Sequence, residues 1–235
     1  MTAIEERVAE VRERMAAACA RAGRRKDEVT LIAVTKGHGV DAIEQALAAG
    51  VRDFGENRVR EAAPKIAELR ARGVSMRWHL IGHLQRNKAP AAIDLFDILH
   101  TVDSERLAEA IDVRAVRRVP VLVEVNVAGE ATKHGAAPGE IPEFVERLLR
   151  YANLDVRGLM TVAPQVDDPE DVRDVFRELR RMRDDLGLGE LSMGMTGDFE
   201  VAIEEGSTLV RVGRAIFGSR PAWRAPAGEP GRGAS

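Results

Sequence analysis

Apolar positions along the chain follow two alternating patterns. Short, β-rich apolar runs recur from residue 29 onward, and between them lie longer segments with apolar residues every three or four positions. The short runs cover residues 29–34, 51–54, 76–81, 98–102, 119–125, 156–160, 188–193 and 209–212. The helical segments include residues 41–49, 57–72, 104–117, 141–151 and 169–186. Strands separated regularly by helices predict parallel pairing through right-handed crossovers.

One more amphipathic helix is predicted ahead of the first strand. Its apolar positions recur at helical spacing with charged residues between them, and they are Ile4, Val8, Val11, Met15 and Cys19. Eight strand-helix units in a chain of this length match the lower end of the (β/α)8 barrel size range, whereas a doubly wound open sheet would leave some strands unexplained. The pattern therefore predicts a single α/β domain, a (β/α)8 TIM barrel with an N-terminal helix, over residues 1–220.

The end of the chain differs from the rest. Residues 221–235 combine proline, glycine and small residues without periodicity, which predicts a disordered C-terminal tail. No apolar run approaches the roughly 18 residues that a membrane helix needs, and the charged start is unlike a signal peptide. We therefore expect a soluble, cytoplasmic protein without a membrane partner.

Composition and charge narrow the range of partners. The chain has 235 residues, 35 basic and 38 acidic side chains and only 4% aromatic residues. This near balance gives no basic footprint for nucleic acid, and few rings are present for stacking on bases, so a nucleic-acid partner is disfavoured. A single cysteine cannot form an internal disulfide and fits a reducing compartment. The charged helical exterior favours a monomer.

Polar residues follow the predicted strands where a barrel places its functional groups, at the carboxyl ends. Lys36 directly continues the first apolar run, and its amine would point into the barrel mouth. Desolvation there lowers the pKa of an ammonium group and makes the neutral amine available for imine formation. The alternative is that Lys36 extends to solvent or pairs with a carboxylate such as Glu56.

Two glycine-containing loops add a second signal. Residues 194–197 (Gly-Met-Thr-Gly) follow the seventh run, and Gly213 and Arg214 follow the eighth. Each loop precedes a helical segment, where backbone N–H groups can hold an anion, and barrels often build phosphate sites from these two loops. Thr196 adds a hydroxyl and Arg214 a charge. Either loop alone would also suit an ordinary turn or cap, but together with Lys36 they predict a phosphate-bearing ligand.

Other motifs carry less weight. His79 and His83 lie four residues apart, a spacing that suits two metal ligands on a helix, but here they span a strand end. We interpret each of them as a histidine with satisfied hydrogen bonds or as a loop histidine, rather than as one of two metal ligands. The chain has no Gly-x-Ser-x-Gly motif, no Walker loop and no dinucleotide fingerprint after the first strand.

Taken together, these motifs resemble the pyridoxal phosphate homeostasis protein family. The matching segments are residues 33–36 (AVTK), 54–57 (FGEN), 79–88 (HLIGHLQRNK), 191–198 (LSMGMTGD) and 206–218 (GSTLVRVGRAIFG). The resemblance implies a barrel similar to the N-terminal domain of alanine racemase, with pyridoxal 5′-phosphate (PLP) as its cofactor.

The same resemblance implies a set of cofactor-binding residues. Lys36 would form the internal aldimine with PLP, Asn57 would lie beside the cofactor, and Arg211 would face the pyridine nitrogen. The loops that bind the phosphate would contribute Met195, Thr196, Gly213 and Arg214. Thr196 stands where serine is more usual and keeps the hydroxyl. Lys133 matches a loop-lysine pattern in which serine commonly follows, whereas His134 follows it here, so the match does not settle a role for Lys133 as a transient PLP carrier.

The resemblance further implies that the protein buffers or delivers PLP and has no established reaction. An arginine beside the pyridine nitrogen disfavours its protonation and weakens the ring as an electron sink. Racemases draw their second acid/base from an additional C-terminal domain, which we do not expect here, and Tyr151 is predicted to lie away from the strand ends. We therefore predict a non-enzymatic protein for PLP and other B6 vitamers that exchanges PLP with apo-PLP enzymes.

Two other functions stay open at this point. A low-activity PLP-dependent amino-acid racemase would need a second base, for which His79, His83 and Lys133 are the candidates. A barrel that binds a phosphorylated metabolite without PLP would form no imine.

Overall fold

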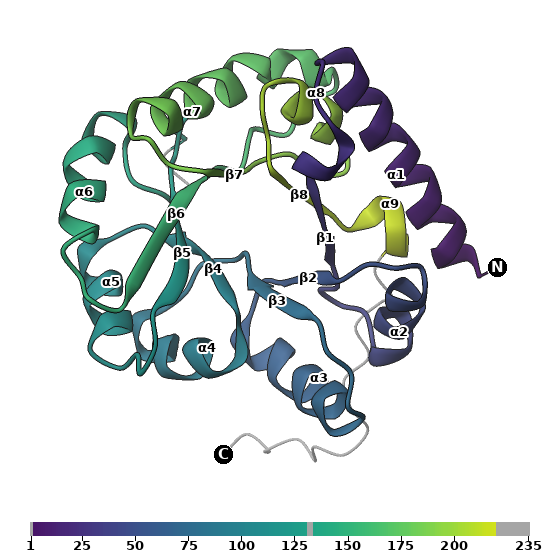
Figure 1. The fold of residues 1–235 in the computed structure, drawn as a ribbon, viewed down its shortest axis with the longest axis horizontal. Coiled ribbons are helices and arrows are strands. Elements are labelled where there is room, and N and C mark those ends of the chain that lie inside the picture. Colours follow the sequence, from purple (N-terminus) through teal and green to yellow (C-terminus); the bar gives the residue numbers. More distant parts are fainter. Residues whose placement is uncertain (1, 131–133, 220–235) are drawn as a thin grey trace, which may run out of the picture.

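Eight parallel strands form the centre of the molecule in the computed structural model, which describes residues 2–130 and 134–219. They close into a barrel in sequence order, and β8 pairs with β1 (Figure 1). The strands are β1 (Thr30–Val34), β2 (Asp53–Glu56), β3 (Arg77–Leu80), β4 (Ile98–Val102), β5 (Val119–Glu124), β6 (Leu154–Met160), β7 (Glu190–Ser192) and β8 (Leu209–Val212). The predicted (β/α)8 fold is confirmed, because each apolar run contains or overlaps one of these strands.

Helices surround the barrel on its outside (Figure 1). They are α1 (Ala3–Arg21), α2 (Val40–Ala48), α3 (Val59–Ala71), α4 (Ala89–Leu95), α5 (Glu105–Asp112), α6 (Ile141–Leu148), α7 (Arg173–Asp185), α8 (Phe199–Glu204) and α9 (Arg214–Phe217). Short 3-10 turns cover Lys26–Glu28, Arg86–Lys88, Pro138–Glu140 and Pro169–Val172. The last of these turns runs into α7, so the predicted segment 169–186 is a 3-10 turn followed by an α-helix.

The predicted N-terminal helix is present as α1. It starts with a capping box, in which Thr2 Oγ1 accepts from the backbone N–H of Glu5 and Glu5 Oε2 accepts from the N–H of Thr2. Its buried face includes Val8, Met15 and Cys19, and the helix packs against α2, α8 and α9. Burial raises the pKa of the Cys19 thiol, so this cysteine serves as a small apolar core residue.

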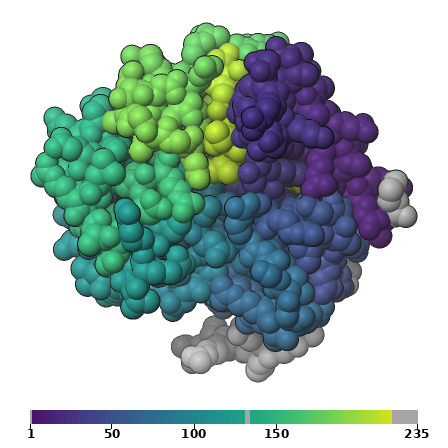
Figure 2. All heavy atoms as spheres, in the orientation of Figure 1, coloured from purple at the N-terminus to yellow at the C-terminus, as the bar shows by residue number. Residues whose placement is uncertain are grey.

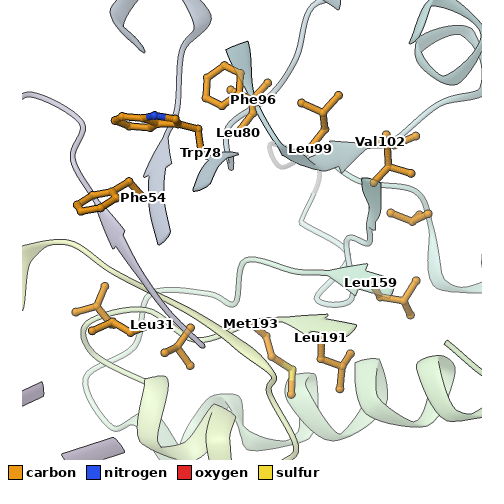
Figure 3. Packing of buried hydrophobic residues seen from close by; sticks show 14 of the residues in the cluster. Leu31, Phe54, Trp78, Leu80, Phe96, Leu99, Val102, Leu159, Leu191 and Met193 are labelled. Carbon is orange, nitrogen blue, oxygen red and sulfur yellow. The ribbon is translucent and has the colours of Figure 1, made fainter. Parts of the chain in front are cut away.

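Two layers of side chains hold the barrel together. Outward-facing strand residues and the apolar faces of the helices form a continuous hydrophobic cluster, part of which Figure 3 shows around Phe54, Trp78 and Leu99. Inside the barrel, Ile32 and Leu122 belong to a separate, much smaller apolar cluster. Atoms fill the centre of the ring in the space-filling view (Figure 2), so the ribbon opening is not a channel.

Two further sequence predictions concern a disordered C-terminal tail and the lack of a membrane-spanning helix. The predicted tail, residues 221–235, lies outside the described residues, as does Lys133. Among the described residues, no helix has the length and apolar character needed to cross a membrane.

Candidate functional site

Lys36 lies at the C-terminal mouth of the barrel, just beyond β1. The backbone N–H of Thr35 donates to the carbonyl of Gly55 (3.0 Å), so the pairing of β1 with β2 continues one residue past the strand. Ile32 faces the barrel interior, and alternate residues of a strand share a face, so Lys36 continues this inward row. Lys36 is half-buried. A lysine in this position can present its amine to a ligand in the mouth.

The turn that carries Lys36 is held by a buried ion pair that the sequence analysis missed. Glu56 is fully buried, and its Oε1 accepts from Lys65 Nζ on α3 (2.8 Å) and from Thr35 Oγ1 (2.6 Å). Burial raises the pKa of Glu56, although the Lys65 ammonium works in the opposite direction. Lys65 Nζ also donates to the carbonyl of Thr35 (3.0 Å). The ion pair therefore fixes the backbone directly before Lys36. The cation that pairs with Glu56 is the ammonium group of Lys65 on α3.

The two loops predicted to hold an anion meet at the same rim. The backbone N–H of Ala215 in α9 donates to Thr196 Oγ1 from the loop after β7, at 3.4 Å. Gly213 is the N-cap residue of α9, and a Cβ there would lie 3.3 Å from the Cβ and the carbonyl oxygen of Val34. Glycine thus allows β8 to end close beside β1. The first N–H groups of a helix lack partners within it, which leaves donors at this junction.

The remaining candidates are distributed around this junction. Strand pairing sets β8 beside β1 and β1 beside β2, so Gly213, Lys36 and Asn57 follow three neighbouring strands. Asn57 is half-buried, and its Oδ1 is one of the buried side-chain atoms without a partner. Met195 and Thr196 are half-buried, whereas Arg214 is exposed. The fold therefore brings the candidate residues of four strand ends to one side of the mouth.

Arg211 differs from these residues, because it lies inside the barrel. It is buried on the inward face of β8, where Nη1 donates to Ser192 Oγ (2.5 Å) and Nη2 to the carbonyl of Thr161 (2.8 Å). Burial lowers the pKa of Arg211 to about 10, while the charges of Asp198 and Glu124 oppose this shift. The guanidinium is therefore still a cation at neutral pH, and it can only donate hydrogen bonds.

Ser192 connects Arg211 to a chain of buried polar side chains that crosses the barrel interior. Ser192 Oγ lies 2.9 Å from Nδ1 of His100, and His100 Nε2 lies 2.9 Å from Nδ1 of His79. His79 Nε2 lies 2.9 Å from Oδ1 of Asp53, and Arg77 Nε contacts the same oxygen at 2.7 Å. The chain thus runs from the start of β2 and β3 to the middle of β8.

Arg211 and Asp53, the charged groups at the two ends of this buried row of hydrogen bonds, fix the direction of every hydrogen bond in it. Arg211 only donates, so the Ser192 hydroxyl accepts from it. The hydroxyl's own hydrogen needs an acceptor in this buried site, and His100 Nδ1 at 2.9 Å is the one beside it, so Ser192 donates to His100. Burial, more than any neighbouring charge, holds the pKa of His100 well below its usual value, so His100 is neutral. Its remaining hydrogen is then on Nε2 and points to His79.

The directions of the hydrogen bonds at the Asp53 end of this buried row are determined in the same way. His79 accepts at Nδ1 and therefore donates from Nε2 to Asp53. Burial alone would raise the pKa of Asp53, but the hydrogen bonds from His79 and Arg77 outweigh it and lower that pKa, so Asp53 is a carboxylate acceptor. All members are satisfied in a single arrangement. We infer that the chain holds the Arg211 guanidinium in one orientation.

Replacing Ser192 by alanine tests this arrangement. The change leaves His100 Nδ1 and one N–H of Arg211 without their partner in a buried site. We expect it to lower the free energy of unfolding by about 2–3 kcal/mol, because one of the lost hydrogen bonds involves a charged group. Urea denaturation followed by circular dichroism measures this value.

Ser207→Ala is the matched control. Ser207 is also fully buried, but its hydroxyl donates only to backbone carbonyls, among them that of Met193 at 2.8 Å. Its loss is expected to cost about 1 kcal/mol. If Ser192→Ala were no more destabilising than Ser207→Ala, the buried chain would not have the energetic role assigned to it.

Glu124 is a second titratable group at the mouth that the sequence analysis did not single out. It ends β5 on the inward face of Leu122, and its Oε2 is buried without a hydrogen-bond partner. Burial raises the pKa of Glu124 to about 7, repulsion from Asp103 adds to this effect, and Arg211 opposes it. Near neutral pH this carboxyl can therefore give or take a proton. The alternation along the strand predicts only that the Glu124 side chain points into the barrel.

The raised pKa of Glu124 predicts a pH-dependent stability. Between the ordinary glutamate pKa of about 4.5 and the folded value of about 7, the folded protein holds a proton that the unfolded chain releases. Stability therefore falls as pH rises through this window, by up to about 3 kcal/mol. Glu124→Gln removes the group. We expect the difference in unfolding free energy between this variant and the wild type to increase by that amount from pH 4.5 to pH 8.

Glu10→Gln, which changes an exposed carboxyl on α1, serves as the control and should show no comparable trend. A Glu124→Gln curve parallel to that of the wild type across this range would show that Glu124 ionises without cost in the folded protein.

The two histidines that were candidates for a metal pair are separated by the fold. His79 is buried and hydrogen-bonded at both ring nitrogens, so its interpretation as a satisfied histidine is confirmed. His83 is exposed in the loop after β3, where its Nδ1 lies 3.4 Å from Oδ2 of Asp103. His79 is therefore fixed in the interior chain.

Comparisons with known proteins agree with this architecture. The family model described as "Alanine racemase, N-terminal domain" matches residues 4–221. The pyridoxal phosphate homeostasis protein of Aquifex aeolicus is 42% identical over 224 residues, which are 92% of this chain and 97% of that protein.

Solved structures give the same picture. An unknown protein from Bifidobacterium adolescentis superposes with a TM-score of 0.84 at 40% identity, over 92% of this chain and 94% of that one. PipY of Synechococcus elongatus, solved with PLP bound, superposes with a TM-score of 0.80 at 36% identity, over 92% of this chain and 100% of that one.

Proposed function

This chain belongs to the pyridoxal phosphate homeostasis protein family, and from that premise we propose that it holds PLP in the barrel mouth and exchanges it with other molecules without a reaction of its own. The observation that carries the proposal is the position of Lys36 between Asn57 and the joined loops of Thr196 and Gly213. PLP is bound in the related PipY structure, which supports the choice of ligand.

The polar groups at the mouth fit PLP. Asn57 Oδ1 and Glu124 Oε2 are buried there without a hydrogen-bond partner in the described part of the chain. Buried polar atoms normally have partners, so this rim is suited to a ligand with several polar groups. The aldehyde of PLP matches a lysine, and its ring hydroxyl matches buried oxygen atoms. Its ring nitrogen matches an arginine, and its phosphate matches the N–H groups at the start of a helix.

Each residue has a distinct proposed role. Lys36 Nζ holds PLP covalently, and Asn57 lies beside it. The phosphate is bound at the junction of the β7 and β8 loops by Thr196 and Gly213, with Arg214 adding charge from the exposed side and Met195 lining the same loop. Arg211 would donate toward the pyridine nitrogen from the barrel interior, through an N–H group other than the two bonded to Ser192 and to the Thr161 carbonyl.

The position of Arg211 supports a non-catalytic role. Bound PLP supplies an aldehyde for bonding to amines and a ring that accepts electrons best when its nitrogen is protonated. A guanidinium held as a permanent donor leaves that nitrogen unprotonated and weakens the ring as an electron sink. Tyr151 lies between α6 and β6, where the strands begin, and so lies at the opposite end from the mouth.

A low-activity amino-acid racemase is the second candidate function, and one observation favours it. Glu124 at the mouth has a pKa of about 7, which suits an acid/base group. It replaces His79 among the candidates for a second base, because both ring nitrogens of His79 are bonded in the interior. Racemisation would exchange the Cα hydrogen of an amino acid with solvent.

Cofactor transfer and hydrogen exchange distinguish the two functions. Protein loaded with PLP and freed of excess cofactor is mixed with an apo-PLP enzyme, and the activity regained is compared with that from free PLP. We expect transfer of most of the bound PLP, together with Cα deuterium exchange no faster than with free PLP. Sustained exchange that Glu124→Gln abolishes would contradict the carrier function and establish the racemase.

The proposal extends to partners and surroundings. We propose that the protein binds other B6 vitamers as well as PLP, that it exchanges PLP with apo-PLP enzymes in the cytoplasm, and that nucleic acid is not a partner. We further propose that the chain acts as a monomer, which light scattering at working concentration tests directly.

A further inference from the structure

The rim of the barrel carries a cluster of potential metal ligands apart from the proposed PLP residues. His83, Asp103 and His134 each offer a ligand atom, and these atoms lie within 4.8 Å of one another. The three residues come from the loops after β3, β4 and β5, which are neighbours in the barrel. The fold therefore brings together side chains that lie far apart along the sequence.

We propose that His83, Asp103 and His134 form a binding site for a divalent transition metal ion of the Zn²⁺ class. Imidazole nitrogen and carboxylate oxygen are ligands that Zn²⁺, Co²⁺ and Ni²⁺ accept, and two histidines with one carboxylate form a known type of open site. Such a set leaves one position for water or for an anionic ligand. The site rests on its own three residues and does not depend on the PLP proposal.

The distances within the cluster fit this chemistry. His83 Nδ1 and Asp103 Oδ2 are 3.4 Å apart, longer than the 2.7–2.9 Å of a good charge-assisted hydrogen bond. Two ligands at about 2.0–2.1 Å from a tetrahedral ion are separated by about 3.4 Å. Asp103 is the more buried member, with a side chain only 15% exposed, so it provides the fixed ligand around which the exposed histidines rotate.

The two histidine rings already lie against each other at this rim. Their rings stack with centroids 3.9 Å apart and planes inclined by 10°. An imidazole nitrogen binds a metal ion in the plane of its ring, so the two rings rotate out of this stack to share one ion. Metal binding requires the neutral imidazole. A shared ion would use both rings together with the Asp103 carboxylate.

The other histidines provide contrast. His79 and His100 are buried in the interior chain, and the ring of His38 packs against Phe217 at a centroid distance of 5.1 Å. His83 and His134 are thus the two of the five histidines that share one nearby carboxylate, that of Asp103.

Titration calorimetry of tag-free, chelator-treated protein with Zn²⁺, and separately with Co²⁺, tests the site. We expect one ion per chain, and a visible Co²⁺ spectrum typical of nitrogen and oxygen ligands. His83→Ala, His134→Ala and Asp103→Asn should each weaken the dissociation constant at least tenfold, since even loss of an outer partner of a metal ligand costs 10–100-fold.

Matched controls separate this site from adventitious binding. His38→Gln changes a histidine outside the cluster, and Glu105→Gln changes an exposed carboxyl two residues from Asp103. Both should leave affinity within about twofold. Lys36→Ala should also bind the ion unchanged, which separates failure of this site from failure of the PLP proposal. Absence of stoichiometric binding, or binding that survives the double change His83→Ala and His134→Ala, would overturn the proposal.

Discussion

Replacing Lys36 by alanine is expected to abolish covalent retention of PLP. The amine is the proposed point of attachment, and no methylene or backbone group can replace it in forming a reducible bond to an aldehyde. Lys36 is half-buried beyond the end of β1, and the ion pair of Glu56 is with Lys65, so the barrel should remain folded. Absorbance of the protein after addition of PLP and removal of the excess measures the effect, and we expect it to fall to background.

Lys26→Ala is the control for this substitution. Lys26 is an exposed lysine in the turn before β1, at the end of the barrel away from the mouth, and its loss should leave the absorbance unchanged. Retention of the full absorbance by Lys36→Ala would place the attachment on another amine.

Replacing Gly158 by alanine is expected to cost more than about 4 kcal/mol of stability. Gly158 in β6 pairs with Glu190 in β7, and an added Cβ would collide with the Glu190 carbonyl group, 2.5 Å from its carbon and 2.8 Å from the Glu190 Cα. These are backbone atoms of a neighbouring strand, so they cannot move aside as a flexible side chain could. Relief requires β6 and β7 to separate, which opens the closed barrel.

Gly189→Ala offers a closely matched control. Gly189 directly precedes β7, and an added Cβ would meet only the Arg157 carbonyl oxygen at 3.9 Å, an ordinary contact distance. Its effect on the unfolding midpoint should be small. Equal denaturation midpoints for the two variants would show that the pairing of β6 with β7 tolerates a side chain at Gly158.

The barrel was predictable because its strands are buried on both faces. Such strands read as short continuous apolar runs, and β1, β4 and β8 coincide closely with the predicted segments. The sequence pattern was less informative for the shortest elements. Helices α4, α8 and α9 are at most seven residues long, too short for helical periodicity to distinguish them from loops.

The position of the mouth residues was predictable for a different reason. A parallel barrel brings all carboxyl ends of its strands to one rim, so Lys36, Asn57 and Thr196 could be placed together from their order along the chain. Their roles toward PLP remain proposals. The contact between Thr196 and Ala215 is a detail of loop conformation that residue order does not determine.

The interior chain could not be derived from the sequence. Asp53, His79, His100 and Ser192 lie in the middle of apolar runs, and hydrogen-bonded partners are 21 to 92 positions apart. Their pairing depends on strand register, which is fixed only when the barrel closes. The same holds for Glu124, whose pKa depends on burial and on the distance to Asp103.

Borohydride reduction of the PLP-loaded wild-type protein, followed by mass spectrometry of its peptides, tests the central claim most directly. Reduction converts the labile bond between PLP and an amine into a stable one, so the modified residue can be identified. The account predicts one pyridoxyl group per chain, located on Lys36. A pyridoxyl group found mainly on another lysine or at the N-terminus, or no modification at all, would contradict it.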